Sequence, residues 1–234
     1  MKLNIHTIIL AGGKGTRMLS KKAKVLQTLG GRTMLNHVIT TANKITDKIS
    51  VVVGFDKEGV EEEIKKIGIN ANIYLQTEQV GTADAVKTTL NDVDEFEKVL
   101  VLYGDVPLIK EETLKKLCSQ ESDLSILTTV LENPTGYGRV LKDKENNVVE
   151  ITEERDADSE QKKIREIFTG ILVAKGGVLK KYIPEINNNN SAKEFYLTDL
   201  ISITHKNGFK IKTFSSSSEE TTGANNRSEQ EELE

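Results

Sequence analysis

A glycine-rich turn directly after an apolar run constrains this chain more than any other feature. The β-branched residues of Ile5–Leu10 predict a buried strand, and residues 11–17 then read AGGKGTR. Glycines let the backbone turn sharply and bring N–H groups close to phosphate oxygens. Lys14 and Arg17 add positive charge at the same place. The stretch therefore predicts a strand that ends in an anion-binding loop.

This loop differs from two common phosphate-binding motifs. A Walker A loop needs Lys after its last glycine, whereas Thr16 follows Gly15. A dinucleotide-binding loop closes on a third glycine, where this chain has Met18. A further cation, Lys24, comes soon after and favours a nucleoside triphosphate with reacting phosphates. The alternative is a glycine-rich strand–helix turn whose Lys and Arg side chains are simply solvated.

Composition is typical of an enzyme in a reducing compartment. The chain has 234 residues, 37% hydrophobic and 29% charged, with a formal net charge of -4. A general nucleic-acid or acidic-membrane binder would be basic, so neither is expected as a partner. The single cysteine, Cys118, cannot form an internal disulfide, which fits the cytoplasm. The N-terminal apolar run is too short for a signal peptide or a membrane span, and we expect neither.

The first 110 residues alternate between strand-like and helix-like patterns. Such alternation, with strands apolar on both faces, predicts an α/β fold with a mostly parallel central sheet flanked by helices. Ligands bind beyond the carboxyl ends of such strands, where the loops at 11–17, 76–82 and 103–105 should gather. The expected strands are 5–10, 49–53, 71–75 and 98–103, and the expected helices are 33–45 (with Thr33 as N-cap), 58–67 and 82–90.

The pattern changes after about residue 110. Short apolar runs separated by polar turns predict a mixed or antiparallel second lobe over about residues 111–227. Over residues 215–222, which begin with a run of four serines, we expect a mobile surface loop, and over 228–234 a short charged helix. The further strands are expected at 124–130, 138–141, 148–152, 171–174 and 209–214, and the helices at 111–118 and 195–205.

Several long segments together make the chain resemble a known family. It is similar, from Ile8 to Arg227, to the uridyltransferase half of the bacterial bifunctional N-acetylglucosamine-1-phosphate uridyltransferase/glucosamine-1-phosphate acetyltransferases, which are sugar nucleotidyltransferases. The resemblance does not extend to the family's left-handed β-helix half. We therefore expect no acetyltransferase activity, and we expect a monomer. The segments that carry the resemblance are 10–18, 24–26, 76–82, 102–109, 134–139, 169–172, 196–199 and 225–227.

The resemblance implies a Rossmann-like nucleotidyltransferase fold over residues 1–227, with a nucleotide-binding lobe (about 1–110) and an acceptor-sugar lobe (about 111–227). It implies transfer of a uridylyl group from UTP to N-acetylglucosamine 1-phosphate, with Mg²⁺ as cofactor. The implied catalytic residues are Arg17, Lys24 and Asp105, and the implied metal ligands are Asp105 and Asn225. Implied nucleotide-binding residues are Leu10, Ala11, Gly12, Gly13, Gly15, Gln76, Gly81 and Thr82, and implied sugar-binding residues are Tyr103, Gly104, Gly138, Glu153 and Thr169.

Two positions depart from the family pattern. Phe168 stands where the family has an Asn that contacts the sugar, so the acceptor pocket is expected to be blocked or reshaped. Ala23 replaces a Pro before Lys24, which predicts a less rigid turn. Two alternatives therefore stand beside the implied activity: a nucleotidyltransferase with another sugar-phosphate acceptor, and a nucleotide-sugar-binding domain with little turnover.

Overall fold

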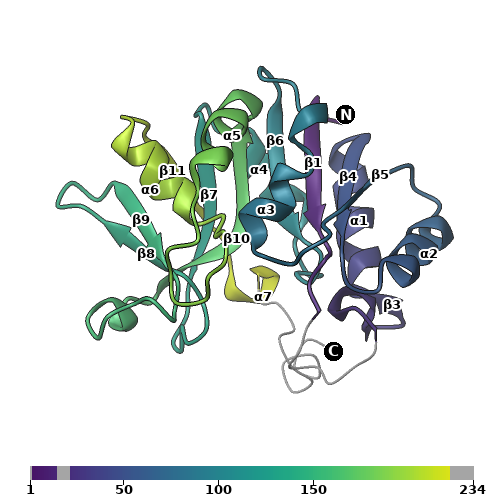
Figure 1. Ribbon diagram of the computed structural model, residues 1–234, viewed down its shortest axis with the longest axis horizontal. Coiled ribbons are helices and arrows are strands. Elements are labelled where there is room, and N and C mark those ends of the chain that lie inside the picture. Colours follow the sequence, from purple (N-terminus) through teal and green to yellow (C-terminus); the bar gives the residue numbers. More distant parts are fainter. Residues whose placement is uncertain (1, 15–21, 222–234) are drawn as a thin grey trace.

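One mixed sheet runs through the middle of the protein (Figure 1). The computed structural model describes residues 2–14 and 22–221. Within them, nine strands join this sheet in the order β11-β7-β10-β6-β1-β4-β5, and the β8–β9 hairpin is attached through β10. The strands are β1 (Ile5–Leu10), β4 (Lys48–Val53), β5 (Asn72–Leu75), β6 (Lys98–Tyr103), β7 (Leu124–Val130), β8 (Arg139–Lys142), β9 (Val148–Thr152), β10 (Glu166–Lys175) and β11 (Ile211–Ser215).

The parallel part of the sheet is the part that alternates with helices in the sequence. β6, β1, β4 and β5 are parallel, whereas β10 runs antiparallel to both β6 and β7, and β11 is parallel to β7. This confirms the predicted α/β fold with a mostly parallel centre. The strands expected of a second lobe continue the same sheet, since β10 pairs directly with β6.

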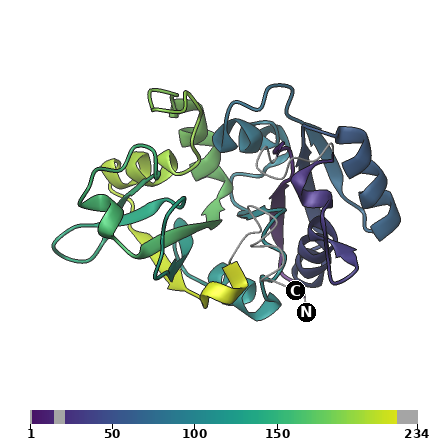
Figure 2. The same ribbon diagram turned by 90° about the horizontal axis from the view of Figure 1, so that it is seen from below.

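Helices cover both faces of this sheet (Figure 2). α1, α2 and α4 contribute apolar residues to one buried cluster, and α3, α5 and α6 contribute to the other. The helices are α1 (Met34–Ile45), α2 (Lys57–Ile67), α3 (Thr82–Lys87), α4 (Glu111–Cys118), α5 (Gly176–Tyr182), α6 (Asp199–Lys206) and α7 (Ser218–Thr221), and two short strands, β2 (Thr28–Leu29) and β3 (Arg32–Thr33), form a hairpin before α1.

Successive side chains of the central strands divide between these two clusters. In β1, Ile8 and Leu10 belong to one cluster and Ile9 to the other, because side chains of a strand alternate between faces. A strand buried on both faces therefore needs a continuous apolar run, which Ile5–Leu10 supplies apart from His6 and Thr7. His6 is wholly buried, its Nε2 lies 2.7 Å from the Ser50 hydroxyl, and burial lowers the pKa of its imidazole.

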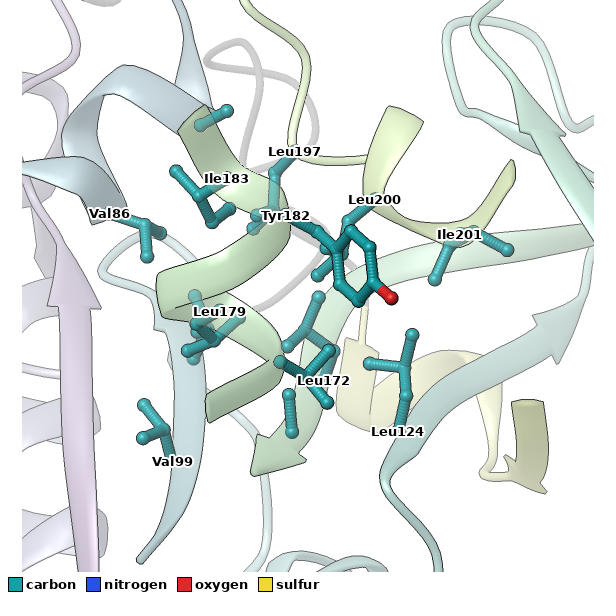
Figure 3. Packing of buried hydrophobic residues seen from close by; sticks show 14 of the residues in the cluster. Val86, Val99, Leu124, Leu172, Leu179, Tyr182, Ile183, Leu197, Leu200 and Ile201 are labelled. Atoms are coloured by element: carbon teal, nitrogen blue, oxygen red, sulfur yellow. The ribbon is translucent and has the colours of Figure 1, made fainter. Parts of the chain in front are cut away.

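The cluster on the α5 side joins the elements before and after residue 110 (Figure 3). Tyr182 of α5 lies at its centre, with Leu172 of β10 and Leu200 of α6 beside it. Val86 of α3 and Val99 of β6 belong to the same cluster. Because these buried side chains come from both parts of the chain, the two parts share one hydrophobic core.

Four elements differ from the expectations. β10 is ten residues long rather than four, and α5 has no counterpart among the predicted helices. The predicted helix 195–205 begins only at Asp199, because the residues before it bond to α3 instead. The predicted surface loop at 215–222 is wrong over Ser218–Thr221, which form α7; Glu220 there is buried and accepts a 2.6 Å hydrogen bond from Thr113 of α4.

Most other predicted boundaries are confirmed within a few residues, although the expected helix 82–90 ends as α helix at Lys87 and continues through a turn into the 3₁₀ segment Leu90–Asp92. The predicted helix 228–234 lies outside the described residues. Within the described part of the chain, no helix combines the length and apolar character needed to span a bilayer.

Thr33 caps α1 as predicted, and its loss has a calculable cost. Its side chain accepts a 3.0 Å hydrogen bond from the Asn36 amide and donates one of 2.8 Å to Glu63 of α2. We expect Thr33→Ala to lower the free energy of unfolding by about 1–2 kcal/mol, the usual effect of removing an N-cap. Thr33→Ser keeps the hydroxyl and should lose less than half as much in the same denaturant titration. Equal losses in both variants would contradict the capping role.

Candidate functional site

Loops that follow three of the parallel strands enclose a cavity at the carboxyl edge of the sheet. Its volume is about 280 Å³. The residues after β1, β5 and β6 meet here, as the parallel arrangement predicts. The lining residues are Leu10, Gly12, Gly13, Lys24, Val25, Gln76, Gln79, Gly81, Thr82, Ala85, Tyr103, Asp105 and Glu194.

Glycine backbone allows the loops to approach one another closely. A Cβ on Gly54 would lie 2.9 Å from the carbonyl oxygen of Gly12, and a Cβ on Gly104 would lie 3.0 Å from Val25 Cγ1. The Gly104 amide donates to the Leu10 carbonyl at 2.9 Å, and the Ala11 amide donates to Val52 at 2.8 Å. The ends of β1 and β6 and the chain around Gly12 are therefore held together by backbone contacts.

The Gln76 side chain has a defined orientation. Its Nε2 donates to the Gly81 carbonyl and to the Asp84 carboxylate, both at 2.9 Å. Because both partners can only accept, the amide nitrogen must face them. The amide oxygen faces Gly12, on which a Cβ would lie 3.4 Å from it. Gln76 thus offers an acceptor on the Gly12 side of the cavity.

An extended segment before α6 is bound to the start of α3. The Phe195 amide donates to Val80 at 2.7 Å, the Ala83 amide donates to Phe195 at 2.9 Å, and Leu197 donates to the Thr82 hydroxyl at 2.9 Å. We call residues 194–198 the strap. Gly81 lies beneath it with φ of +131°, and a Cβ there would lie 2.4 Å from the Phe195 carbonyl oxygen. Only glycine fits at this position.

Lys24 and Asp105 bring opposite charges together in this cavity. Lys24 follows a buried Ala23, and Asp105 comes two residues after β6. The Lys24 ammonium donates to Asp105 Oδ2 in an ion pair that is largely shielded from solvent. The cavity therefore presents a cation and a carboxylate at one point of its wall, which suits a ligand that carries both phosphate groups and a metal ion.

A second cavity of about 220 Å³ adjoins the first. It is lined by Tyr103, Asp105, Val106, Gly136, Tyr137, Gly138, Glu153, Phe168, Thr169, Gly170, Thr198 and Thr221. Tyr103 and Asp105 line both cavities. The Tyr103 ring lies against Gly170, where a Cβ would come within 2.8 Å of it, and burial raises the pKa of its phenol. A protonated Tyr103 hydroxyl, hydrogen-bonded to Thr82, thus stands at the boundary between the cavities.

Glu153, together with Asp105, supplies a carboxyl group to the second cavity. Burial, together with the nearby carboxylates of Asp199 and Asp156, raises its pKa. The Thr198 hydroxyl donates to its Oε1 at 3.0 Å. Gly138 packs so closely that a Cβ would lie 2.8 Å from Ile151 and 3.6 Å from both Glu153 oxygens. Glu153 is therefore placed to hydrogen-bond hydroxyl or amide groups of a ligand.

The side chain of Phe168 contributes an apolar wall to this second cavity. It is only 5% exposed and belongs to the core cluster beneath the sheet. The cavity beside it stays open at about 220 Å³. The expected obstruction by Phe168 is therefore not observed, whereas an apolar surface replaces the expected amide.

Most of the predicted site residues lie around these two cavities. Those that line them are Leu10, Gly12, Gly13, Lys24, Gln76, Gly81, Thr82, Tyr103, Asp105, Gly138, Glu153 and Thr169. Ala11 and Gly104 lie behind the lining, in backbone hydrogen bonds. Arg17, Gly15 and Asn225 fall outside the described residues, and so do their predicted roles.

Sequence reasoning missed several lining residues, among them Gln79, Glu194, Thr198 and Thr221. Gln79 and Thr198 were within segments already singled out for their resemblance to the family. Glu194 and Thr221 reach the cavities only through the strap and α7, which had been predicted as a helix and a loop. The family segments thus held a signal for Gln79 and Thr198, whereas no local pattern marked Glu194 or Thr221.

A family match covers most of the fold that carries these loops and the strap. The family description of MobA-like NTP transferase domains matches residues 7–165. The chain belongs to this family of nucleotidyltransferases.

Closer relatives support the resemblance found in the sequence. The chain is 42% identical over 234 residues to the bifunctional protein GlmU of Ruthia magnifica subsp. Calyptogena magnifica, and 42% identical over 233 residues to that of Clostridioides difficile. These alignments cover 99% and 97% of the chain but 51% and 50% of the relatives. The chain thus spans about half the length of the relatives it matches, and the predicted resemblance to the uridyltransferase half is confirmed.

Solved structures share the fold of this MobA-like domain at low sequence identity. A Bacillus anthracis structure described as a glucose-1-phosphate thymidylyltransferase superposes with a TM-score of 0.76 at 21% identity, covering 98% of this chain and 93% of that one. The inositol-1-phosphate CTP transferase of T. maritima gives 0.71 at 18% identity, covering 93% and 88%. Both confirm the Rossmann-like fold expected from the sequence.

The contact between Gly81 and the strap predicts a large effect of one methyl group. We expect Gly81→Ala to lower the free energy of unfolding by about 2–4 kcal/mol, because it adds both backbone strain and a collision with Phe195. Gly13→Ala is the control, since a Cβ there meets no heavy atom within 4 Å. Its unfolding midpoint should match that of the wild type in thermal melts. Equal unfolding midpoints for Gly81→Ala and Gly13→Ala would show that the strap does not contact Gly81 closely.

Proposed function

We propose that this protein transfers the uridylyl group of UTP to N-acetylglucosamine 1-phosphate, releasing pyrophosphate and forming UDP-N-acetylglucosamine. The identity of 40–43% to GlmU proteins over almost the whole chain supports an activity of this half of GlmU. The match to NTP transferase domains supports a nucleoside triphosphate as donor. The product would serve cell-wall precursor synthesis, and the single cysteine fits action in the cytoplasm.

One observation carries the proposal: Tyr103 and Asp105 line both cavities. A donor in the first cavity and an acceptor in the second would therefore meet at Asp105. In-line attack of a sugar phosphate on the α-phosphorus of a nucleotide requires such an arrangement, because catalysis of phosphoryl-type transfer rests mainly on positioning and charge neutralisation.

Lys24 would neutralise charge at the meeting point. Its ammonium already lies at Asp105, so a small rearrangement would bring it to the α-phosphate and the attacking sugar phosphate. Two anions repel each other, and a fixed cation between them lowers the barrier to their approach. The backbone of Gly12 and Gly13 would hold the phosphates that leave as pyrophosphate, with Gly15 and Arg17 proposed to act beside them.

The residues present fit a magnesium ion. Asp105 offers carboxylate oxygen at the edge of the phosphate site, and magnesium prefers oxygen ligands supplied by one or two protein groups, phosphates and water. Among residues 2–14 and 22–221, no three His, Cys, Asp or Glu side chains gather as a complete metal cage. We propose Asp105 and Asn225 as the ligands. When bound, the ion would supply further neutralisation of the phosphate charge.

Gln76 would read the base. Its amide oxygen faces Gly12, and an acceptor there suits the N3–H donor of uracil. Cytosine carries no hydrogen at N3, so two acceptors would face each other unpaired. The orientation imposed by Asp84 and the Gly81 carbonyl therefore favours UTP over CTP.

The acceptor site favours an N-acetylated sugar phosphate for two reasons. Glu153, Thr198 and the Gly138 backbone offer polar partners for hydroxyl groups. Phe168 offers an apolar surface suited to a methyl group such as that of an acetamido substituent. Two alternatives to this activity remain. The apolar wall at Phe168 is compatible with a different sugar-phosphate acceptor, and the protein could instead be a nucleotide-sugar-binding domain with little turnover.

The deciding experiment measures pyrophosphate release. With UTP, N-acetylglucosamine 1-phosphate and Mg²⁺, the wild type should turn over, and a chelator should abolish the reaction. Lys24→Ala should lower kcat by at least about a hundredfold with the fold intact, since such a cation acts mainly in the transition state. Lys22→Ala is the matched control and should retain most of the activity. UTP binding by calorimetry without turnover would instead support the binding domain.

Acceptor kinetics test the role of Phe168. We expect Phe168→Asn to lower the KM for N-acetylglucosamine 1-phosphate about two- to tenfold, because one added hydrogen bond to the sugar outweighs the apolar contact that the substitution removes. The KM for UTP should not change. Phe168→Leu, which stays apolar, should give no such gain, and a panel of sugar phosphates compares the acceptors. Unaltered acceptor constants in Phe168→Asn would show that this side chain does not contact the sugar.

A further inference from the structure

The backbone that carries Lys24 is held by a side chain from another loop. Lys24 begins the 3₁₀ turn Lys24–Leu26, directly after the fully buried Ala23. The Ala23 amide donates a 3.0 Å hydrogen bond to Asp56 Oδ2. Asp56 follows β4 and precedes α2, 33 residues away in the sequence. One side chain thus fixes the backbone immediately before the lysine that pairs with Asp105.

Asp56 adopts a rare backbone conformation. Its φ and ψ are 54° and 44°, in the left-handed region that few residues other than glycine and Asn or Asp enter. It occupies the N-cap position of α2, where an Asp usually accepts a hydrogen bond from the helix backbone, yet its side chain makes no such bond. The carboxylate is used for Ala23 instead.

The neighbouring residues make room for this arrangement. Gly59 has no side chain, and a Cβ there would lie 2.6 Å from Asp56 Oδ1. The Phe55 amide donates to the Gly12 carbonyl at 3.1 Å, and the Lys14 ammonium lies 5.5 Å from the centre of the Phe55 ring. Phe55 and Asp56 therefore contact the glycine-rich segment at Gly12 and the chain that follows it at Ala23.

We propose that Asp56 is a positioning residue that holds Lys24 in place through the Ala23 amide. This inference rests on the proposed role of Lys24 in uridylyl transfer. Without that hydrogen bond the turn is less rigid, and the Lys24 ammonium is held less firmly between the phosphates. Misplacement of such a group by about 1 Å lowers kcat more than it lowers the affinity for the substrate.

Proline at position 23 supplies an independent test, because it stiffens the backbone and has no amide hydrogen to donate. Ala23 has a φ of -55°, which lies within the range that proline imposes. Asp56→Gly removes the carboxylate while keeping the left-handed conformation free of strain. Asp56→Asn retains both an acceptor and tolerance of that conformation.

We expect Asp56→Gly to lower kcat about tenfold with the KM for UTP within about twofold, and Asp56→Asn to stay within about threefold of the wild type. In the Ala23→Pro background, Asp56→Gly should cause no further loss, because the hydrogen bond it would break is already absent. Hydrogen exchange of peptides that contain the Ala23 amide should be at least about fivefold faster in Asp56→Gly.

The outcomes separate this inference from the proposed function. A wild type that releases no pyrophosphate overturns the proposed function. Independently of that result, an unchanged hydrogen-exchange rate of the Ala23 amide in Asp56→Gly shows that the Asp56–Ala23 hydrogen bond is absent and overturns this inference. Faster exchange with unaltered kcat means that the hydrogen bond exists but does not position Lys24. A tenfold loss that persists equally in the Ala23→Pro background also rejects the inference, because Asp56 would then act by another route. Thermal melts of all four variants exclude general unfolding as the cause.

Discussion

The register of β1 between β4 and β6 is the constraint on which the rest of this structure depends. Leu10 pairs with Val52 on one side and with Tyr103 on the other, so all three strands end within one residue of the same level. Backbone hydrogen bonds join the end of β1 to both neighbours. The Ala11 amide donates to Val52 of β4, and the Gly104 amide, just after β6, donates to Leu10. A shift by one residue would turn every apolar side chain of β1 to the opposite face. The core thus fixes the level at which Gly12 and Asp105 emerge.

Two adjoining cavities follow from that arrangement, and the strap connects them. Residues 194–198 bond to Val80, Thr82 and Ala83 beside the first cavity, and Thr198 bonds to Glu153 in the second. Tyr103 stands between them, with its ring against Gly170. The donor and acceptor sites that we propose are therefore parts of one hydrogen-bonded unit.

Patterns local in the sequence predicted most of this fold. The apolar runs of β1, β4 and β6 are buried on both faces, and the strands were predictable because each is a mainly apolar run of residues in the sequence. Thr33 was recognisable as an N-cap because a hydroxyl before an apolar periodic run is a local signal. Most cavity residues lay in loops directly after such strands, which is why the sequence pointed to them.

The features that were missed depend on contacts distant in the sequence. Residues 195–198 have a helical pattern, yet their amides bond to Val80 and Thr82, about 115 residues earlier. α7 forms where polar serines predicted a loop, because Glu220 finds Thr113 and Lys110 at the start of α4. The contact between Asp56 and Ala23 is equally invisible to local pattern. Tertiary partners overrode local preference in each case.

The position of β10 limits how such a protein can diversify. This strand lies between β6 and β7 and contributes Phe168, Thr169 and Gly170 to the second cavity while its other residues fill the core. Recombination that exchanged the elements around the second cavity for those of another enzyme would remove an interior strand and leave β6 with an open edge. Change of ligand preference at the second cavity is thus expected to proceed by point substitution along β10 rather than by exchange of modules.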